Sequence, residues 1–278
     1  MNVTFQEASA TLLSNMQSRP NVRVNTIRTY EMLSRRANAV LGNVSLATFT
    51  NKHLKDFVQH LQQEGKAPAT IQSHVVFAKS VLSSVVDDNG DMVFALKFNN
   101  KFIAAPAVKP KQQKTPVATK EDIERALNCG DEAVARFVTL AAASGMRVSE
   151  ILGSDTIYNA ELGAVQIRRG KTDSSERTIY LTPEFNEWLR VHGGPPVRLS
   201  LNSLRNRLRK FGLPACHSYR RFRATHCRRA GMLEEILKNQ LGHAVGGDIT
   251  DRYSKLNEDV EFVRREVERV GIGFAIEA

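Results

Sequence analysis

Residues 217–226 read His217-Ser-Tyr-Arg220-Arg-Phe-Arg-Ala-Thr225-His226 and lie at the start of a helical pattern over residues 218–230. His217 and Arg220 are three residues apart, so one face of that helix carries both side chains. The segment belongs to a basic region: from Trp188 to Leu233 the chain has 11 lysines and arginines and no acid. A phosphate backbone is the natural counter-charge for so many cations, and arginine suits it through its paired donors. The region therefore indicates nucleic-acid binding.

The whole chain has the composition of a globular protein with an excess of positive charge. Its 278 residues are 42% hydrophobic and 24% charged, with a net charge of +10. These values exclude disordered, collagen-like and disulfide-stapled classes. The three cysteines show no C-x-x-C pair, and neither a secretory signal nor an apolar run of membrane-spanning length is visible. We expect a reduced, cytoplasmic protein that does not enter membranes.

A proline- and lysine-rich segment over residues 106–118 predicts a linker between two domains, 1–105 and 119–278. The first domain is predicted to be entirely helical, because apolar residues recur three or four positions apart. The second is predicted to be mostly helical with one β-hairpin, Ala164–Arg169 and Arg177–Thr182, because hydrophobicity alternates there. The fold class is therefore mainly α with a small antiparallel β-sheet (α+β).

Four further positions outside the basic region could carry chemistry. Arg147 follows the glycine that ends an alanine-rich helix, where donors can point at an anion. Lys171 lies in the predicted hairpin turn, His243 follows Gly242 at a predicted helix end, and Tyr253 comes ten residues later. Each has an ordinary alternative, such as a surface ion pair of Arg147 with Glu150, a capping histidine or a packed tyrosine.

Metal chemistry has little support in the sequence. The sequence has no H-E-x-x-H motif and no phosphate-binding glycine loop, and the basic region has no acidic cluster. Cys216-His217 and His226-Cys227 lack the short paired spacings of structural zinc sites. We therefore expect no metal and no cofactor.

Read in order, these residues resemble the tyrosine recombinases, the phage-integrase family. Ala-Ser-Gly-Met-Arg147-Val-Ser-Glu150 is similar to the first arginine box of that family, and His217-Ser-Tyr-Arg220 to the second. Leu241-Gly-His243 resembles its L-G-H element, while Lys171 and Tyr253 match the hairpin lysine and the nucleophile. Tyr219 departs from the pattern, because leucine is usual before the second arginine.

The resemblance implies a two-domain DNA clamp, with a helical core-binding domain over 1–105 and a catalytic tyrosine-recombinase domain over 119–278. It implies a metal-free transesterification in which Tyr253 attacks the scissile phosphate and forms a 3′-phosphotyrosyl link. Arg147 and Arg220 would stabilise the charged transition state, and Lys171 would protonate the leaving 5′-oxygen. His217 would manage the tyrosine proton, His243 would bind the phosphate, and Glu150 would orient the arginines.

Further expectations concern partners and alternatives. The partner is double-stranded DNA, with a directionality factor as an additional partner and a homotetramer on DNA through the C-terminal tail. The tail helix over 259–270 could instead pack on its own domain. The alternatives are a Xer-like housekeeping resolvase, a DNA-binding regulator that does not cleave, and a topoisomerase-like relaxing enzyme. The predicted contacts to the DNA backbone are basic residues of the acid-free region: Arg205, Arg207, Arg209, Lys210, Arg221 and Arg223.

Overall fold

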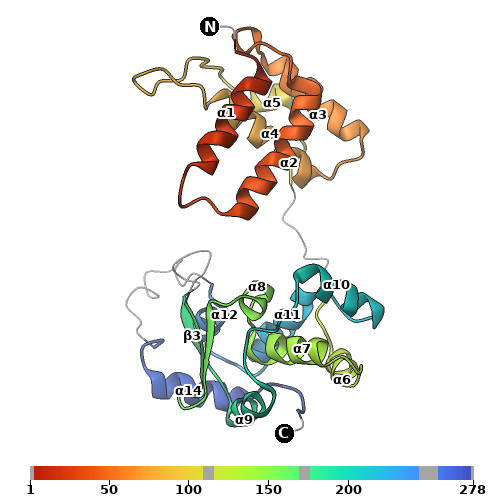
Figure 1. Cartoon of the computed structure of the whole chain (residues 1–278), viewed down its shortest axis with the longest axis vertical. Coiled ribbons are helices and arrows are strands. Elements are labelled where there is room, and N and C mark those ends of the chain that lie inside the picture. Colours follow the sequence, from red (N-terminus) through yellow and green to blue (C-terminus); the bar gives the residue numbers. More distant parts are fainter. Residues whose placement is uncertain (1–2, 109–115, 169–175, 244–255, 277–278) are drawn as a thin grey trace. The chain divides into compact units, whose positions relative to one another are not determined.

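The chain divides into two compact units, residues 1–112 and 113–278, each with its own hydrophobic core (Figure 1). The computed structural model describes residues 3–108, 116–168, 176–243 and 256–276. The division between the units falls within the segment 106–118 that the sequence predicts as a linker.

The first unit is a helical bundle, as its periodicity predicts. Its α1 helix starts with a capping box between Thr4 and Glu7, and α3 starts with Thr50 as N-cap. Large aromatic side chains, including Phe5, Phe57 and Phe77, are fully buried between the helices. The helices are α1 (Phe5–Gln17), α2 (Val24–Leu41), the 3-10 helix η1 (Leu46–Thr48), α3 (Asn51–Gln63), α4 (Pro68–Leu82) and α5 (Asn100–Ile103).

The second unit combines helices with one small sheet, which confirms the α+β class. Its described helices are α6 (Lys120–Leu127), α7 (Glu132–Ser144), α8 (Val148–Leu152), α9 (Pro183–His192), α10 (Leu201–Lys210), α11 (Cys216–Arg229), α12 (Glu234–Leu241) and α14 (Val260–Val270). Thr119 and Asp122 form a capping box at the start of α6. Helices α7 and α11 pack against each other in the middle of the unit (Figure 1).

The sheet has three antiparallel strands in the order β1-β2-β3. Strands β2 (Ala164–Ile167) and β3 (Arg177–Tyr180) form the predicted hairpin, with Ile167 opposite Arg177. The preceding strand β1 (Thr156–Asn159) pairs with β2 and was not predicted. The register places Arg177 and Ile179 on the buried face of β3.

The C-terminal helix α14 packs on its own unit, which is one of the two arrangements considered for the tail helix. Val263, Val267 and Val270 are buried in a cluster with side chains of α11 and α12. Beyond the helix, Ile272 is buried in the main core of the unit, and Phe274 packs edge-on against Phe222. The tail therefore contributes apolar surface to the domain that carries it.

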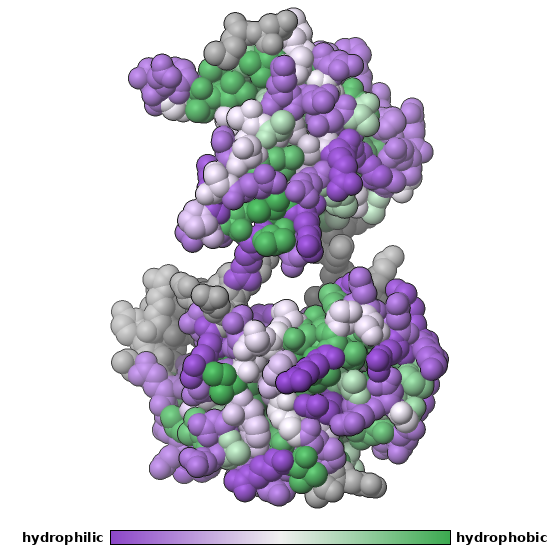
Figure 2. Space-filling model, in the orientation of Figure 1, coloured by the Kyte–Doolittle hydropathy of each residue, from purple (hydrophilic) through white to green (hydrophobic). Residues whose placement is uncertain are grey.

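The described helices include none that is both long and apolar enough to cross a lipid bilayer. The surface in view is mainly hydrophilic, with smaller hydrophobic areas between the polar side chains (Figure 2).

Candidate active site

Arg147 lies at the junction of α7 and α8, as the sequence predicts. Gly145 ends α7 in the left-handed conformation (φ 72°), and Arg147 is the N-cap of α8. Its backbone N–H and its Nη1 donate to the two Glu150 carboxylate oxygens over 2.7 and 2.8 Å. Its Nη2 donates to the Gly242 carbonyl oxygen over 2.6 Å. The guanidinium therefore joins α8 to the end of α12.

Arg220 reaches the same place from α11. Its Nη1 donates to the Gly145 carbonyl oxygen and its Nη2 to the Leu241 carbonyl oxygen, each over 2.6 Å. The Nη2 atom also lies 3.0 Å from Nε2 of His243. Burial and the neighbouring positive charge of Arg147 lower the pKa of Arg220 to about 10, so the guanidinium stays charged at neutral pH.

The two arginines and two histidines line one cleft of about 550 Å³. Partial burial and the charge of Arg220 lower the pKa of both His217 and His243 below the ordinary value. Both imidazoles are therefore neutral at pH 7. A neutral His243 can accept the Arg220 N–H at Nε2, which leaves its Nδ1 protonated and available as a donor.

Glu150 is the acidic centre of this cluster, and its side chain is only 6% exposed. Burial alone would raise its pKa, but hydrogen bonds and charge from Arg177 and Arg147 outweigh burial and lower it. Arg177 was not among the predicted residues. It donates to both Glu150 oxygens over 3.0 Å and to the Gln240 carbonyl oxygen over 2.9 Å. The sequence signal that could have identified Arg177 is the alternation along β3, which places this charged residue on the same inward face as Ile179.

Lys171 and Tyr253, the predicted general acid and nucleophile, lie outside the described residues. Three tyrosines of the second unit are described, and none of them lines the cleft. Tyr158 donates to the carbonyl oxygen and Oδ1 of Asn186 over 2.9 and 2.8 Å. Tyr219 is fully buried and packs edge-on against Phe137. It points into the core and away from the cleft, because adjacent residues of a helix such as Tyr219 and Arg220 face different directions.

The structure corrects part of the predicted DNA-contact set. Arg223 is only 6% exposed and donates to the Gly271 carbonyl oxygen, so it supports the tail and has no surface for DNA. Arg207 forms an ion pair with Asp131 over 2.9 Å, an acid from outside the acid-free region. Arg221 lines the cleft. The other predicted contacts are exposed on α10: Arg205, Arg209 and Lys210.

No group of three or more histidine, cysteine or acidic side chains suited to a metal occurs among the residues that the structure describes. Cys227 of the weighed zinc arrangement is buried, and His226 approaches the Val270 carbonyl oxygen over 2.9 Å. The cationic side chains that line the cleft are Arg147, Arg220, Arg221, Arg228 and Lys238.

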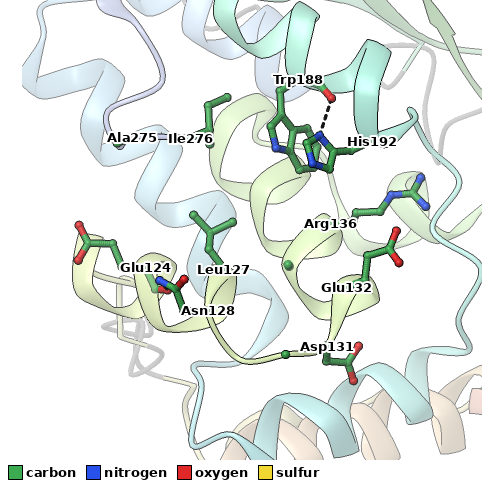
Figure 3. Close-up of a pocket in the computed structure, with 12 residues that line it drawn as sticks. Glu124, Leu127, Asn128, Asp131, Glu132, Arg136, Trp188, His192, Ala275 and Ile276 are labelled. Atoms are coloured by element: carbon green, nitrogen blue, oxygen red, sulfur yellow. Dashed lines mark hydrogen bonds between the residues drawn. The ribbon is translucent and has the colours of Figure 1, made fainter. Parts of the chain in front are cut away.

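A second hollow of about 550 Å³ lies elsewhere on the same unit, lined by α6, α7, α9 and the tail (Figure 3). Trp188 and His192 stack along one side with ring centroids 4.5 Å apart, and Ile276 lies near them. Arg136 is held by the carbonyl oxygens of Gly193 and Gly194. None of the candidate catalytic residues lines this hollow.

The left-handed Gly242 gives a stability prediction. At φ 64° a Cβ here would lie 2.6 Å from Arg177 Nη1 and 3.1 Å from Arg147 Nη1. Gly242→Ala should reduce the free energy of unfolding by about 1–3 kcal/mol through backbone strain, with a further loss of similar size from the collision. Gly212→Ala is the matched control, since Gly212 has φ 61° and open space at its Cβ position. Urea denaturation measures both, and equal losses would contradict the collision.

Comparison with solved structures shows that the fold is that of DNA integrases. The Tn1549 transposon integrase in complex with transposon right end DNA matches with a TM-score of 0.65 and 19% identity, over 96% of this chain and 99% of that one. A lambda integrase dimer bound to a COC' core site matches with a TM-score of 0.63 and 18% identity, over 90% and 77%. A lambda integrase tetramer bound to a Holliday junction matches with a TM-score of 0.63 and 17% identity, over 89% and 80%.

Both integrases are tyrosine recombinases, so the likeness confirms the fold expected from the sequence. No protein-family model and no curated protein sequence matches the chain. The comparison accordingly establishes the architecture.

Proposed function

We propose that this protein is a site-specific DNA recombinase that cleaves and rejoins DNA through a 3′-phosphotyrosyl intermediate. The observation that carries the proposal is the convergence of Arg147 and Arg220, from different elements, with two neutral histidines in one cleft. Beside the cleft, the guanidinium groups of Arg147, Arg177 and Arg220 form a cluster with the Glu150 carboxylate. The cluster therefore has an excess of two positive charges, which suits a phosphate whose charge grows in the transition state.

In the proposed reaction the Tyr253 oxygen forms a bond to phosphorus as the bond from phosphorus to the 5′-oxygen breaks. His217 takes the phenol proton, and Lys171 gives a proton to the departing 5′-oxygen. Arg147, Arg220 and His243 donate to the non-bridging oxygens. A 5′-hydroxyl of another strand then reverses these steps, because the phosphotyrosyl bond retains the phosphodiester energy.

We further propose that the first unit grips the DNA together with Arg205, Arg209 and Lys210 of the second, and that four copies assemble on it. The lambda integrase tetramer bound to a Holliday junction supports this assembly by analogy. Exchange of α14 between copies would take Val263 and Val267 out of the cluster in which they are buried, whereas contact through its exposed face would leave them in place. We also propose that the protein acts in the cytoplasm as the integrase of a mobile element, and that a directionality factor is an additional partner.

The test is a covalent adduct that forms in EDTA. Duplexes that bind the protein are first isolated by affinity selection. Nicked versions of these duplexes are then incubated with the protein, and the adduct is separated by denaturing electrophoresis. Tryptic digestion should then assign the nucleotide to a peptide containing Tyr253. Specific binding without an adduct would favour the non-cleaving regulator, and relaxation of any supercoiled plasmid would favour a topoisomerase.

A pH profile tests the role of His217. Burial and the charge of Arg220 lower the pKa of His217 below its ordinary value of about 6.5. The second-order rate constant for adduct formation, which reports the free protein, should therefore fall at low pH with a midpoint below about 6.5. In His217→Gln the rate should be lower and the acid limb should disappear. An acid limb centred above 6.5 in the wild type would contradict the assignment.

A further inference from the structure

The side chain of Arg177 is almost completely enclosed, at 1% exposure, whereas that of Arg147 is 33% exposed. It lies at the first position of β3, and its donors go to the Glu150 carboxylate and the Gln240 carbonyl oxygen. These contacts tie the sheet, α8 and α12 together. Each of the three elements holds or adjoins a residue of the proposed site.

Glu150 in turn determines where Arg147 lies. One Glu150 oxygen accepts from the Arg147 backbone and from Arg177 Nη2, and the other accepts from Arg147 Nη1 and Arg177 Nη1. Arg177 also fixes this carboxylate to β3 and to the Gln240 carbonyl oxygen. Without Arg177, Glu150 is held only by Arg147 itself, so the two side chains can shift together.

We propose that Arg177 is a positioning residue for strand cleavage: it fixes Glu150, and through Glu150 it aims Arg147 at the scissile phosphate. The proposal rests on the proposed function. Arg177 has a second effect through charge, because it offsets the Glu150 carboxylate and leaves the charges of Arg147 and Arg220 to the phosphate. Removing Arg177 halves the positive excess of the cluster, from two charges to one.

A chemically matched ion pair elsewhere separates this role from ordinary support of the fold. Arg269 on α14 donates to both carboxylate oxygens of Glu266 over 2.8 and 2.9 Å. It also donates to the carbonyl oxygens of Ala230 and Gly231. Like Arg177, it thus bonds both oxygens of one carboxylate and backbone carbonyl oxygens, but it is 50% exposed and has no contact with Glu150 or Arg147. Arg269→Met is therefore the control for Arg177→Met.

The experiment measures adduct formation at saturating DNA, with DNA affinity and thermal unfolding measured on the same proteins. Arg177→Met should slow the adduct about 100-fold, and Arg269→Met should stay within about threefold of the wild type. Arg177→Lys, which keeps the charge and folds more readily, should recover about tenfold of the loss. All should bind DNA within about threefold of the wild type. An unchanged rate in Arg177→Met would overturn the proposal.

A substrate with a methylphosphonate at the scissile position separates a positioning role from a loss of stability, because a loss of stability would slow adduct formation equally on both substrates. This group has one negative charge fewer, so its transition state depends less on the aim and charge of Arg147. The Arg177→Met deficit should shrink to about tenfold or less on it. An equal deficit on both substrates would show a merely structural role. A wild type that forms no adduct would overturn the proposed function together with this inference, whereas an active Arg177→Met beside an active wild type overturns this inference alone.

Discussion

A Tyr253→Phe protein is expected to bind DNA like the wild type and to form covalent adduct at least about 10⁴-fold more slowly, because the substitution removes only the attacking oxygen. The assignment rests on spacing and on the positions of the other tyrosines. Tyr158 is hydrogen-bonded to Asn186, Tyr219 is buried in the core, and the ring of Tyr180 lies 5.3 Å from the guanidinium of Arg264. Tyr30 belongs to the first unit and packs on Phe77.

The matched controls are Tyr158→Phe and Tyr180→Phe, which remove a hydroxyl from the same unit outside the cleft. Both should form adduct within about threefold of the wild-type rate, although Tyr158→Phe should lose about 1 kcal/mol of stability with its hydrogen bonds. Denaturing electrophoresis and a filter-binding titration of each protein measure the two quantities. An adduct that persists in Tyr253→Phe would show that another residue is the nucleophile and would remove the main support for the mechanism.

Local features of the sequence were enough to predict most of the fold. The alanine-rich run before Gly145 and the Leu-Gly pair at Gly242 predict helix ends, and both glycines have the left-handed conformation that ends a helix. Strand β1 was missed because Thr156–Asn159 is too short to show an alternation. Its pairing with β2 is a tertiary interaction that local sequence does not reveal.

Within the acid-free basic region, the sequence does not distinguish arginines that line the site from arginines that support the fold. Arg220 and Arg223 are three residues apart on one basic helix, and the composition of the helix does not distinguish between them. In the structure Arg220 reaches the cleft, whereas Arg223 supports the tail through Gly271. Likewise the pair of Arg177 with Glu150 joins residues 27 positions apart, and only the packing of β3 beside α8 and α12 creates it. Which cation is buried depends on what packs against its helix or strand.

Arg220→Lys is expected to slow adduct formation by about 10²–10³-fold, the loss that follows removal of one fixed donor to a developing oxyanion. Arg220 bonds the carbonyl oxygens of Gly145 and Leu241 and still contacts His243. A lysine ammonium is a single point of charge, so it cannot hold both carbonyls and a phosphate oxygen in one geometry.

Arg229→Lys is the control on the same helix, because Arg229 is exposed and does not line the cleft. It should react within about threefold of the wild-type rate, and both lysine variants should bind DNA with similar affinity because each keeps its charge. Single-turnover adduct formation at saturating DNA isolates the chemical step from binding. A full rate in Arg220→Lys would mean that charge alone suffices at this position. The two carbonyl contacts that fix the guanidinium would then stabilise the fold without contributing to the reaction.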